Sequence, residues 1–176
     1  MHKLYVILYF LAAFGLLSCN GKHENAPKSN LNQAQINEKL VGANKASVQF
    51  ENEQIDKLTS DNGWKMTETA TGLRYQFIEK GNGAKAETEK VAVLEYEVKL
   101  FSGELIYSSK QNGLKEFRIG SGGVESGLEE GILLLKIGDK VRFIIPSYLA
   151  HGLSGDQDKI PSKATLIYTV KLIDLK

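Results

Sequence analysis

The sequence predicts an α+β fold, in which an antiparallel sheet packs against one short helix and a helical segment precedes the sheet. Two kinds of apolar spacing support this prediction. Before Asp61-Asn62-Gly63, apolar residues recur at loosely helical intervals, whereas after Gly63 they alternate with polar residues, as in strands with one dry face. One helical period, between Val124 and Leu135, interrupts the alternation.

The alternating segments predict strands that share one apolar face. Leu73, Tyr75 and Phe77 form a first strand, which the turn signal Gly81-Asn82-Gly83 ends. In the longest alternation, Glu95, Glu97 and Lys99 oppose the apolar residues Ala92, Leu94, Tyr96, Val98 and Leu100. Further strands are expected over residues 105–107, 117–119, 141–145 and 165–175.

The helical period predicts the single helix of the domain. Its apolar positions follow the spacing i, i+4, i+8 and i+11, at Val124, Leu128, Ile132 and Leu135. Glu129 and Glu130 lie early, where the helix dipole favours acids, and Lys136 and Gly138 mark the expected end. We expect the apolar stripe of this helix to be buried against the dry face of the sheet.

The region before the sheet divides into a tether and an arm. Residues 19–34 are polar, with Gly21 and Pro27, and predict a flexible tether. Residues 35–63 predict an arm of one or two amphipathic helices, with apolar positions at Ile36, Leu40, Val48, Ile55 and Leu58. The arm would pack on the domain or pair with a second copy; a solvated spacer is the alternative.

The first residues indicate export. Lys3 precedes an apolar run over residues 4–17, which is too short for a ~30 Å hydrocarbon core. We therefore interpret residues 1–18 as a signal peptide. The run ends in Leu16-Leu17-Ser18-Cys19, which resembles the bacterial lipobox, whose cysteine is diacylated. A buried structural thiol is the alternative, but Cys19, the only cysteine, has no folded neighbourhood.

The lipid would attach the protein to a membrane of the bacterial cell envelope. Residues 20–24 contain one acid, Glu24, so they resemble surface-export signals only weakly. We expect the outer membrane and its periplasmic face.

Composition excludes several other classes of function. The formal net charge is +1 and no polybasic run occurs, so we expect no nucleic-acid partner. The three histidines are scattered and match no metal-ligand spacing, so we expect no metal. Residues 120–123, Gly-Ser-Gly-Gly, precede the helix, but Glu125 stands where a dinucleotide fingerprint needs glycine. We expect no cofactor.

Several phrases in order resemble the FKBP-type peptidyl-prolyl isomerases over residues 71–176. They include Gly127-Leu128-Glu129-Glu130-Gly131, Ile144-Ile145-Pro146, Leu149-Ala150-His151-Gly152 and Lys159-Ile160-Pro161. Within the family, the chain is most similar to lipid-anchored members from Bacteroidetes, including the gliding-motility-associated type. These also carry a polar, helical N-terminal segment and an Asn-Gly-Trp, here Asn62-Gly63-Trp64.

The resemblance implies an FKBP-like half-barrel over residues 64–176, wrapped around the helix, with a loop over residues 144–161 at the rim of a proline pocket. Tyr96, Leu128, His151 and Tyr168 would be catalytic, and His151 would replace a tyrosine that donates to a ligand carbonyl. The substrate-binding residues would be Ile106, Tyr107, Phe117, Val124, Ile160 and Glu125, the last through its backbone N–H. The alternative for each apolar wall residue is core packing.

The chain departs from the family pattern at three wall positions. Tyr107 replaces an acid, Leu128 replaces the common aromatic floor, and Ile106 replaces an aromatic. We therefore expect a wider pocket, modest activity and poor binding of macrolide inhibitors. The resemblance implies isomerisation of X–Pro bonds in envelope proteins, as a folding helper. The alternatives are a non-catalytic chaperone that holds proline-containing segments and a homodimeric clamp formed through the arm.

Overall fold

The computed structural model describes residues 32–176. The expected signal peptide, Cys19 and most of the expected tether lie outside the described residues. Between residues 32 and 176, no helix combines the length and the apolar character that crossing a membrane requires. Residues 42–176 form one compact unit, and the described residues before them, 32–41, belong to a second unit.

The arm contains one continuous helix, α2 (Gln33–Asp61), and not two. Its start is a reciprocal cap, in which Asn32 Oδ1 accepts from the Gln35 N–H at 2.8 Å and Gln35 Oε1 accepts from the Asn32 N–H at 3.0 Å. The expected apolar face is only partly used, because Ile55 is buried whereas Val48 is exposed.

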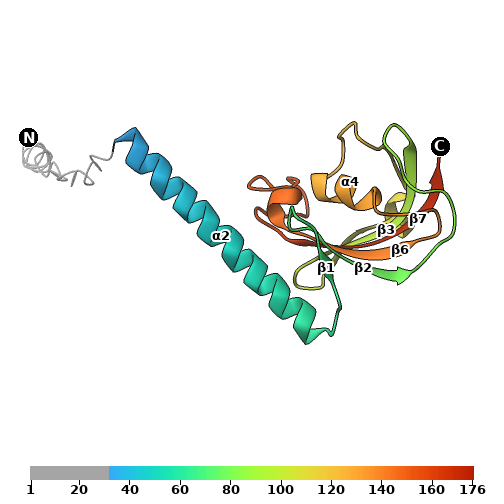
Figure 1. Ribbon diagram of the computed structural model, residues 1–176, viewed down its shortest axis with the longest axis horizontal. Coiled ribbons are helices and arrows are strands. Elements are labelled where there is room, and N and C mark those ends of the chain that lie inside the picture. Colours follow the sequence, from blue (N-terminus) through green and yellow to red (C-terminus); the bar gives the residue numbers. More distant parts are fainter. Residues whose placement is uncertain (1–31) are drawn as a thin grey trace, which may run out of the picture. The chain divides into compact units, whose positions relative to one another are not determined.

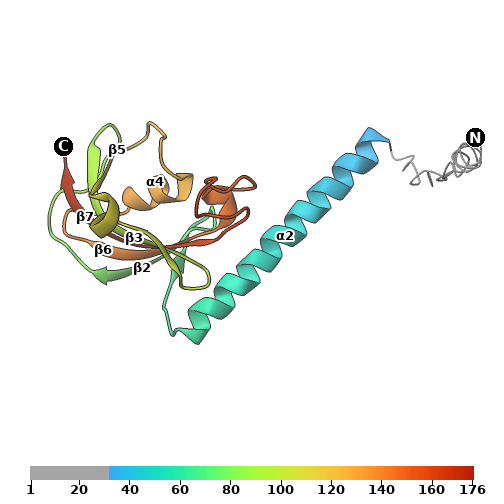
Figure 2. The ribbon, with the colours of Figure 1, turned by 180° about the vertical axis from the view of Figure 1, so that it is seen from behind.

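The domain is an antiparallel sheet, as predicted, with seven strands, of which the two-residue first strand was not predicted (Figure 1). Its spatial order is β1-β2-β6-β7-β3-β4, and β5 also pairs with β3. The strands are β1 (Thr67–Glu68), β2 (Arg74–Glu79), β3 (Val91–Leu100), β4 (Leu105–Ser108), β5 (Lys115–Arg118), β6 (Lys140–Ile145) and β7 (Leu166–Leu175). On the edge of β3 away from β7, β5 pairs with residues 91–94 and β4 with residues 97–99 (Figure 2).

The short helix, α4 (Ser126–Ile132), lies along the concave side of the sheet (Figure 1). A Cβ added at Gly127 would lie 2.5 Å from Ile145 Cγ2, and one added at Gly131 would lie 2.7 Å from the Phe143 ring. These two glycines, one helical turn apart, therefore let the helix approach β6 closely. Leu128 on the same helix is fully buried.

The helix is shorter than its apolar period predicted. Val124 and Leu135 lie outside it, although Leu135 is fully buried in the core. Two further helical turns, α3 (Ser109–Asn112) and the 3-10 turn η1 (Ser147–Leu149), were not predicted. Both lie in connections next to the candidate site.

Polar contacts join α2 to the sheet. The Arg74 side chain, which is almost completely buried, donates to Asp56 Oδ1 at 2.9 Å and to Asn52 Oδ1 at 3.3 Å. The Arg142 guanidinium lies 4.0 Å from the centre of the Trp64 ring, just after α2. The expectation that the arm packs on the domain is therefore confirmed for the part of α2 around Asn52 and Asp56.

Candidate active site

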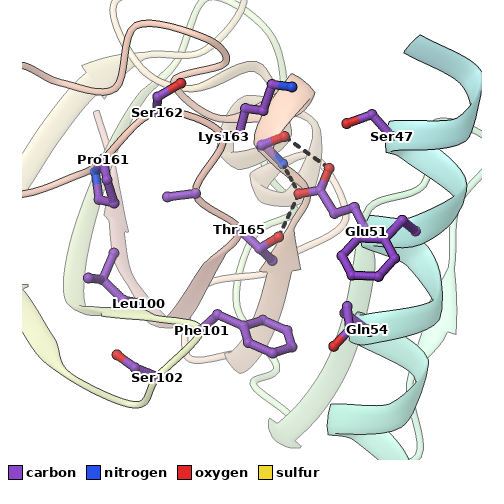
Figure 3. A pocket seen from close by; sticks show the side chains of 13 residues that line it. Ser47, Glu51, Gln54, Leu100, Phe101, Ser102, Pro161, Ser162, Lys163 and Thr165 are labelled. Atoms are coloured by element: carbon purple, nitrogen blue, oxygen red, sulfur yellow. Dashed lines mark hydrogen bonds between the residues drawn. The ribbon is translucent and has the colours of Figure 1, made fainter. Parts of the chain in front are cut away.

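The loop between β6 and β7, residues 146–165, is held at its base by Glu51 of α2. Glu51 Oε1 accepts from the Ser147 N–H at 2.6 Å and from Thr165 Oγ1 at 2.5 Å, and Glu51 Oε2 accepts from Ser147 Oγ at 2.9 Å. Ser147 and Thr165 flank the loop, so one carboxylate ties its two ends together (Figure 3).

A groove of about 540 Å³ opens beside these contacts (Figure 3). Phe50 of α2, Leu100 and Phe101 at the end of β3, and Pro161 give it a partly apolar lining. It contains none of the site residues that the sequence predicted.

The far part of the same loop is organised by Asp156. Its Oδ1 accepts from the N–H groups of Asp158 at 3.0 Å and Ile160 at 2.7 Å, and its Oδ2 accepts from the Tyr107 hydroxyl at 2.5 Å. Burial acts to raise the pKa of Asp156, but the hydrogen bonds, with that from Tyr107 foremost, lower it to about 2. Tyr107 thus fixes the loop to β4 and, through Asp156, positions Ile160.

Gly155 makes this turn possible. Its φ is +63°, and a Cβ there would overlap the carbonyl oxygen of Ile160. Only glycine therefore fits this position without moving the loop.

Beneath the loop lies a cavity of about 220 Å³. Residues from β3, β4, α3, β5, β7 and the loop line it, together with Glu125, which immediately precedes α4. Its lining residues are Tyr96, Val98, Tyr107, Asn112, Lys115, Glu125, His151, Asp156, Ile160 and Tyr168. A neighbouring cavity of about 240 Å³ shares Lys115, Glu125 and His151 and adds Gly123, Val124 and Ala150. Glu125 and His151 therefore line both cavities.

The Glu125 carboxylate is the most deeply buried charge of this site, because only 6% of its side chain is exposed. Its Oε1 accepts from the Tyr168 hydroxyl at 2.5 Å and lies 3.0 Å from His151 Nε2. Its Oε2 is buried and has no hydrogen-bond partner among the described residues.

The electrostatics of Glu125 follow from these neighbours. Burial acts to raise its pKa, but the hydrogen bond from Tyr168 and the charge of Lys115 outweigh burial and hold the pKa below its ordinary value. In turn, burial and the Glu125 charge raise the pKa of the Tyr168 phenol well above its ordinary value. Glu125 is therefore ionised and Tyr168 protonated at neutral pH.

The structure brings together most, but not all, of the predicted site residues. Tyr96, Tyr107, Glu125, His151, Ile160 and Tyr168 line the first cavity, and Val124 lines the second. Ile106, Phe117 and Leu128 are buried in the core and line neither cavity, so for them the alternative of core packing fits better. They belong to the core cluster against which the cavity residues Tyr96 and Val124 pack.

The cavity wall is more polar than the apolar wall residues implied by the resemblance would make it, because Glu125 and Asp156 line it as well. Glu125 turns its side chain toward the cavities because the Tyr168 hydroxyl and His151 give it partners there. His151, expected to donate to a ligand carbonyl, is held by this carboxylate.

Sequence reasoning also missed Asn112, Lys115 and Asp156 in the lining. One signal could have indicated Asp156. Tyr107 stands where the family usually has an acid, and a tyrosine hydroxyl there needs a hydrogen-bond acceptor, which Asp156 provides.

The family profile of the FKBP-type peptidyl-prolyl cis-trans isomerases matches residues 82–173, more than half of the chain. The chain belongs to this family. The FKBP-like fold predicted from the sequence is therefore confirmed, and solved structures agree with it. The crystal structure of FkpA from Escherichia coli superposes with a TM-score of 0.61 at 27% identity, covering 99% of this chain and 82% of that one.

Curated relatives from other bacteria are similar in sequence. A probable FKBP-type peptidyl-prolyl cis-trans isomerase FkpA of Neisseria meningitidis is 35% identical over 140 residues, which are 78% of this chain and 51% of the relative. FkpA of Escherichia coli K12 is 34% identical over 125 residues, which are 70% of this chain and 44% of the relative. The chain thus spans about half the length of these relatives.

Proposed function

We propose that this protein catalyses the cis–trans isomerisation of X–Pro bonds in polypeptides and thereby assists the folding of envelope proteins. Family membership supports the proposal. The observation that carries it is the convergence of Tyr96, Ile160 and Tyr168 on one cavity beneath a fastened loop.

The reaction requires no nucleophile and no cofactor. Rotation about an amide faces a barrier of ~18–20 kcal/mol because resonance must be broken. A site that binds the twisted amide better than either planar form lowers this barrier. Twisting removes charge separation from the amide, so a site that excludes water favours the twisted form.

In this site, Ile160 and the Tyr96 ring would contact the prolyl ring, and the loop would exclude water from it. The Glu125 backbone N–H would donate to a substrate carbonyl. Because Tyr168 already donates to the Glu125 carboxylate, its hydroxyl contributes by orienting that side chain.

The test is the rate of cis–trans exchange in a short X–Pro peptide, measured by NMR with the mature chain. We expect acceleration over buffer, and a several-fold lower kcat/KM for Tyr96→Ala and Ile160→Ala. The control is Glu87→Gln, since Glu87 is exposed and makes no hydrogen bond or ion pair within residues 32–176. A rate equal to that of buffer at tens of micromolar protein would refute the proposal. Suppression of aggregation without turnover would favour the non-catalytic chaperone instead.

We further propose that the protein is a lipoprotein of the Bacteroidetes type, anchored through Cys19 to the outer membrane and facing the periplasm. The apolar run over residues 4–17 and the lipobox-like Leu16-Leu17-Ser18-Cys19 support this. The periplasmic face would bring the domain close to newly exported polypeptides. Cys19→Ala should move the protein from the membrane fraction to the soluble fraction and abolish labelling by a fatty-acid probe. Unchanged fractionation would contradict the anchor.

The arm supports a proposal of homodimerisation. Val41 and Val48 of α2, seven positions apart and therefore on one face of the helix, are exposed apolar side chains that a second copy could cover. Sedimentation of the mature chain with and without residues 20–62 tests this. A monomer in both cases would contradict it.

A further inference from the structure

Glu125 places an ionised carboxylate with one oxygen lacking a hydrogen-bond donor in the wall of the candidate proline pocket. Only 6% of its side chain is exposed, and the residue lines both cavities. Oε1 has two partners, whereas Oε2 has none among the described residues. A buried acceptor without a donor is unfavourable, so a ligand that brings a donor to this carboxylate gains more than one that does not.

The charges around Glu125 do not balance it. In the lining of the first cavity, the ionised acids are Glu125 and Asp156, and the one lysine is Lys115. The Lys115 ammonium lies 5.8 Å from the centre of the Tyr96 ring and forms no ion pair in the described part of the chain. Counted over acids and lysines alone, the lining of this cavity therefore carries one negative charge in excess.

The tyrosines that face Glu125 add no charge to this lining. Tyr168 on β7 and Tyr96 on β3 are uncharged, because burial raises the pKa of both phenols. The Tyr107 hydroxyl on β4 donates its hydrogen bond to Asp156 and not to Glu125. His151 on the loop lies with Nε2 at 3.0 Å from Oε1, and the Lys159 ammonium lies outside the lining, 5.2 Å from the centre of the Tyr107 ring.

Of the two contacts that Glu125 Oε1 makes, a ligand could replace the one with His151 more easily than the one with Tyr168. Its side chain is 29% exposed, and Glu125 is its only hydrogen-bond partner within residues 32–176. A rotation of the imidazole toward solvent would open Oε1 to a ligand in either cavity, while the Tyr168 hydroxyl keeps the carboxylate in position. A charged donor from a substrate could then take the place of the histidine.

We propose that Glu125 is a specificity-determining residue that selects polypeptides with a lysine or arginine next to the isomerised proline. The ammonium or guanidinium group would donate to the Glu125 carboxylate, while the prolyl ring occupies the cavity near Ile160. An acidic residue at the same place would meet the negative wall and be rejected. This inference rests on the proposed isomerase function and names its substrate class.

The test uses peptides that differ only in the residue next to proline, with lysine, alanine or glutamate placed before it in one series and after it in another. NMR exchange gives kcat and KM without an auxiliary protease. We expect kcat/KM for the lysine peptide to exceed that for the glutamate peptide by about tenfold or more in one series, because a charge-assisted hydrogen bond contributes roughly that factor. The difference should lie in KM, since the contact is made in the ground state as well.

The variant Glu125→Gln should reduce the lysine-to-glutamate ratio to within about twofold of unity, because it removes the charge and keeps the shape. Glu87→Gln, which removes one exposed negative charge elsewhere, should leave the ratio unchanged. If Glu125→Gln fails to fold, the wild-type ratio and its decrease with added salt still test the proposal.

The outcomes separate the inference from the function on which it rests. Equal turnover of lysine and glutamate peptides by the wild type, or a ratio that Glu125→Gln does not change, would overturn the inference and leave the isomerase activity standing. Absence of turnover with every peptide would overturn the activity. Binding of the same peptides, followed by chemical-shift titration, would then decide whether the carboxylate selects basic segments.

Discussion

Replacing Glu51 by alanine tests how strongly α2 holds the loop over residues 146–165. The carboxylate accepts three hydrogen bonds, from the Ser147 N–H, the Ser147 hydroxyl and the Thr165 hydroxyl. Ser147 and Thr165 are only 9% and 6% exposed, so their donors lose their acceptor and gain little water in return. A buried donor left unpaired costs about 1–3 kcal/mol, and the hydroxyls can turn toward other acceptors, so the total loss should be about 2–4 kcal/mol.

The assay is urea unfolding of the mature chain, followed by circular dichroism. We expect a lower midpoint with an unchanged m-value, and a Tm lower by roughly 5–15 °C. Glu53→Ala is the matched control, because Glu53 lies on the same helix, is exposed, and within residues 32–176 its side chain accepts a hydrogen bond only from Gln49. Its effect should stay within about 0.5 kcal/mol. Equal effects of the two substitutions would show that the Glu51 contacts contribute nothing to stability.

Two further substitutions test the packing and the electrostatics of the domain. Gly131→Ala should destabilise the fold by about 1–3 kcal/mol, because the new Cβ would press on the buried Phe143 ring, whereas Gly42→Ala, with open space around it, should be neutral or slightly stabilising in the same urea titration. A stabilising Gly131→Ala would contradict the close approach of α4 and β6. Tyr107→Phe removes the donor that lowers the pKa of Asp156 to about 2, so it should lower the Tm at pH 7. A depressed pKa stabilises the fold above the ordinary carboxyl pKa of about 3.9, and this contribution disappears as the pH falls through 2. The Tm difference from the wild type should therefore shrink between pH 5 and pH 2, and a difference independent of pH would disprove the role of Asp156.

The longer strands could be predicted from sequence because apolar and polar residues alternate along them, whereas β1, with both residues exposed, gave no such signal. The alternation around Leu94 and Val98 is reproduced in β3, where both side chains are buried and Glu95 between them is exposed. The end of α4 was not predictable in this way. Apolar periodicity reports burial and not backbone conformation, and Leu135 is buried from a turn beyond the helix.

The site was predictable in position but not in the direction of its side chains. The family resemblance located Glu125 by its backbone N–H, yet its carboxylate is drawn inward by Tyr168, which lies 43 residues further along the chain. The arm shows the same limit. Its apolar spacing suggested hydrophobic packing, but the contacts of Glu51 with Ser147 and Thr165 are polar and depend on residues about a hundred positions away.

The carboxylate of Glu51 also bears on how the protein should be prepared for tests of the proposed isomerase activity. A truncated version that starts at Gly63 would keep every residue of both cavities but lose the acceptor at the base of the loop. Rates measured on such a version would depend both on the catalytic step and on the free energy needed to order the loop over residues 146–165, which Glu51 would no longer hold. Comparing it with a version that starts before Ser47 would separate the two, and would reveal whether a segment outside the family's common domain tunes turnover.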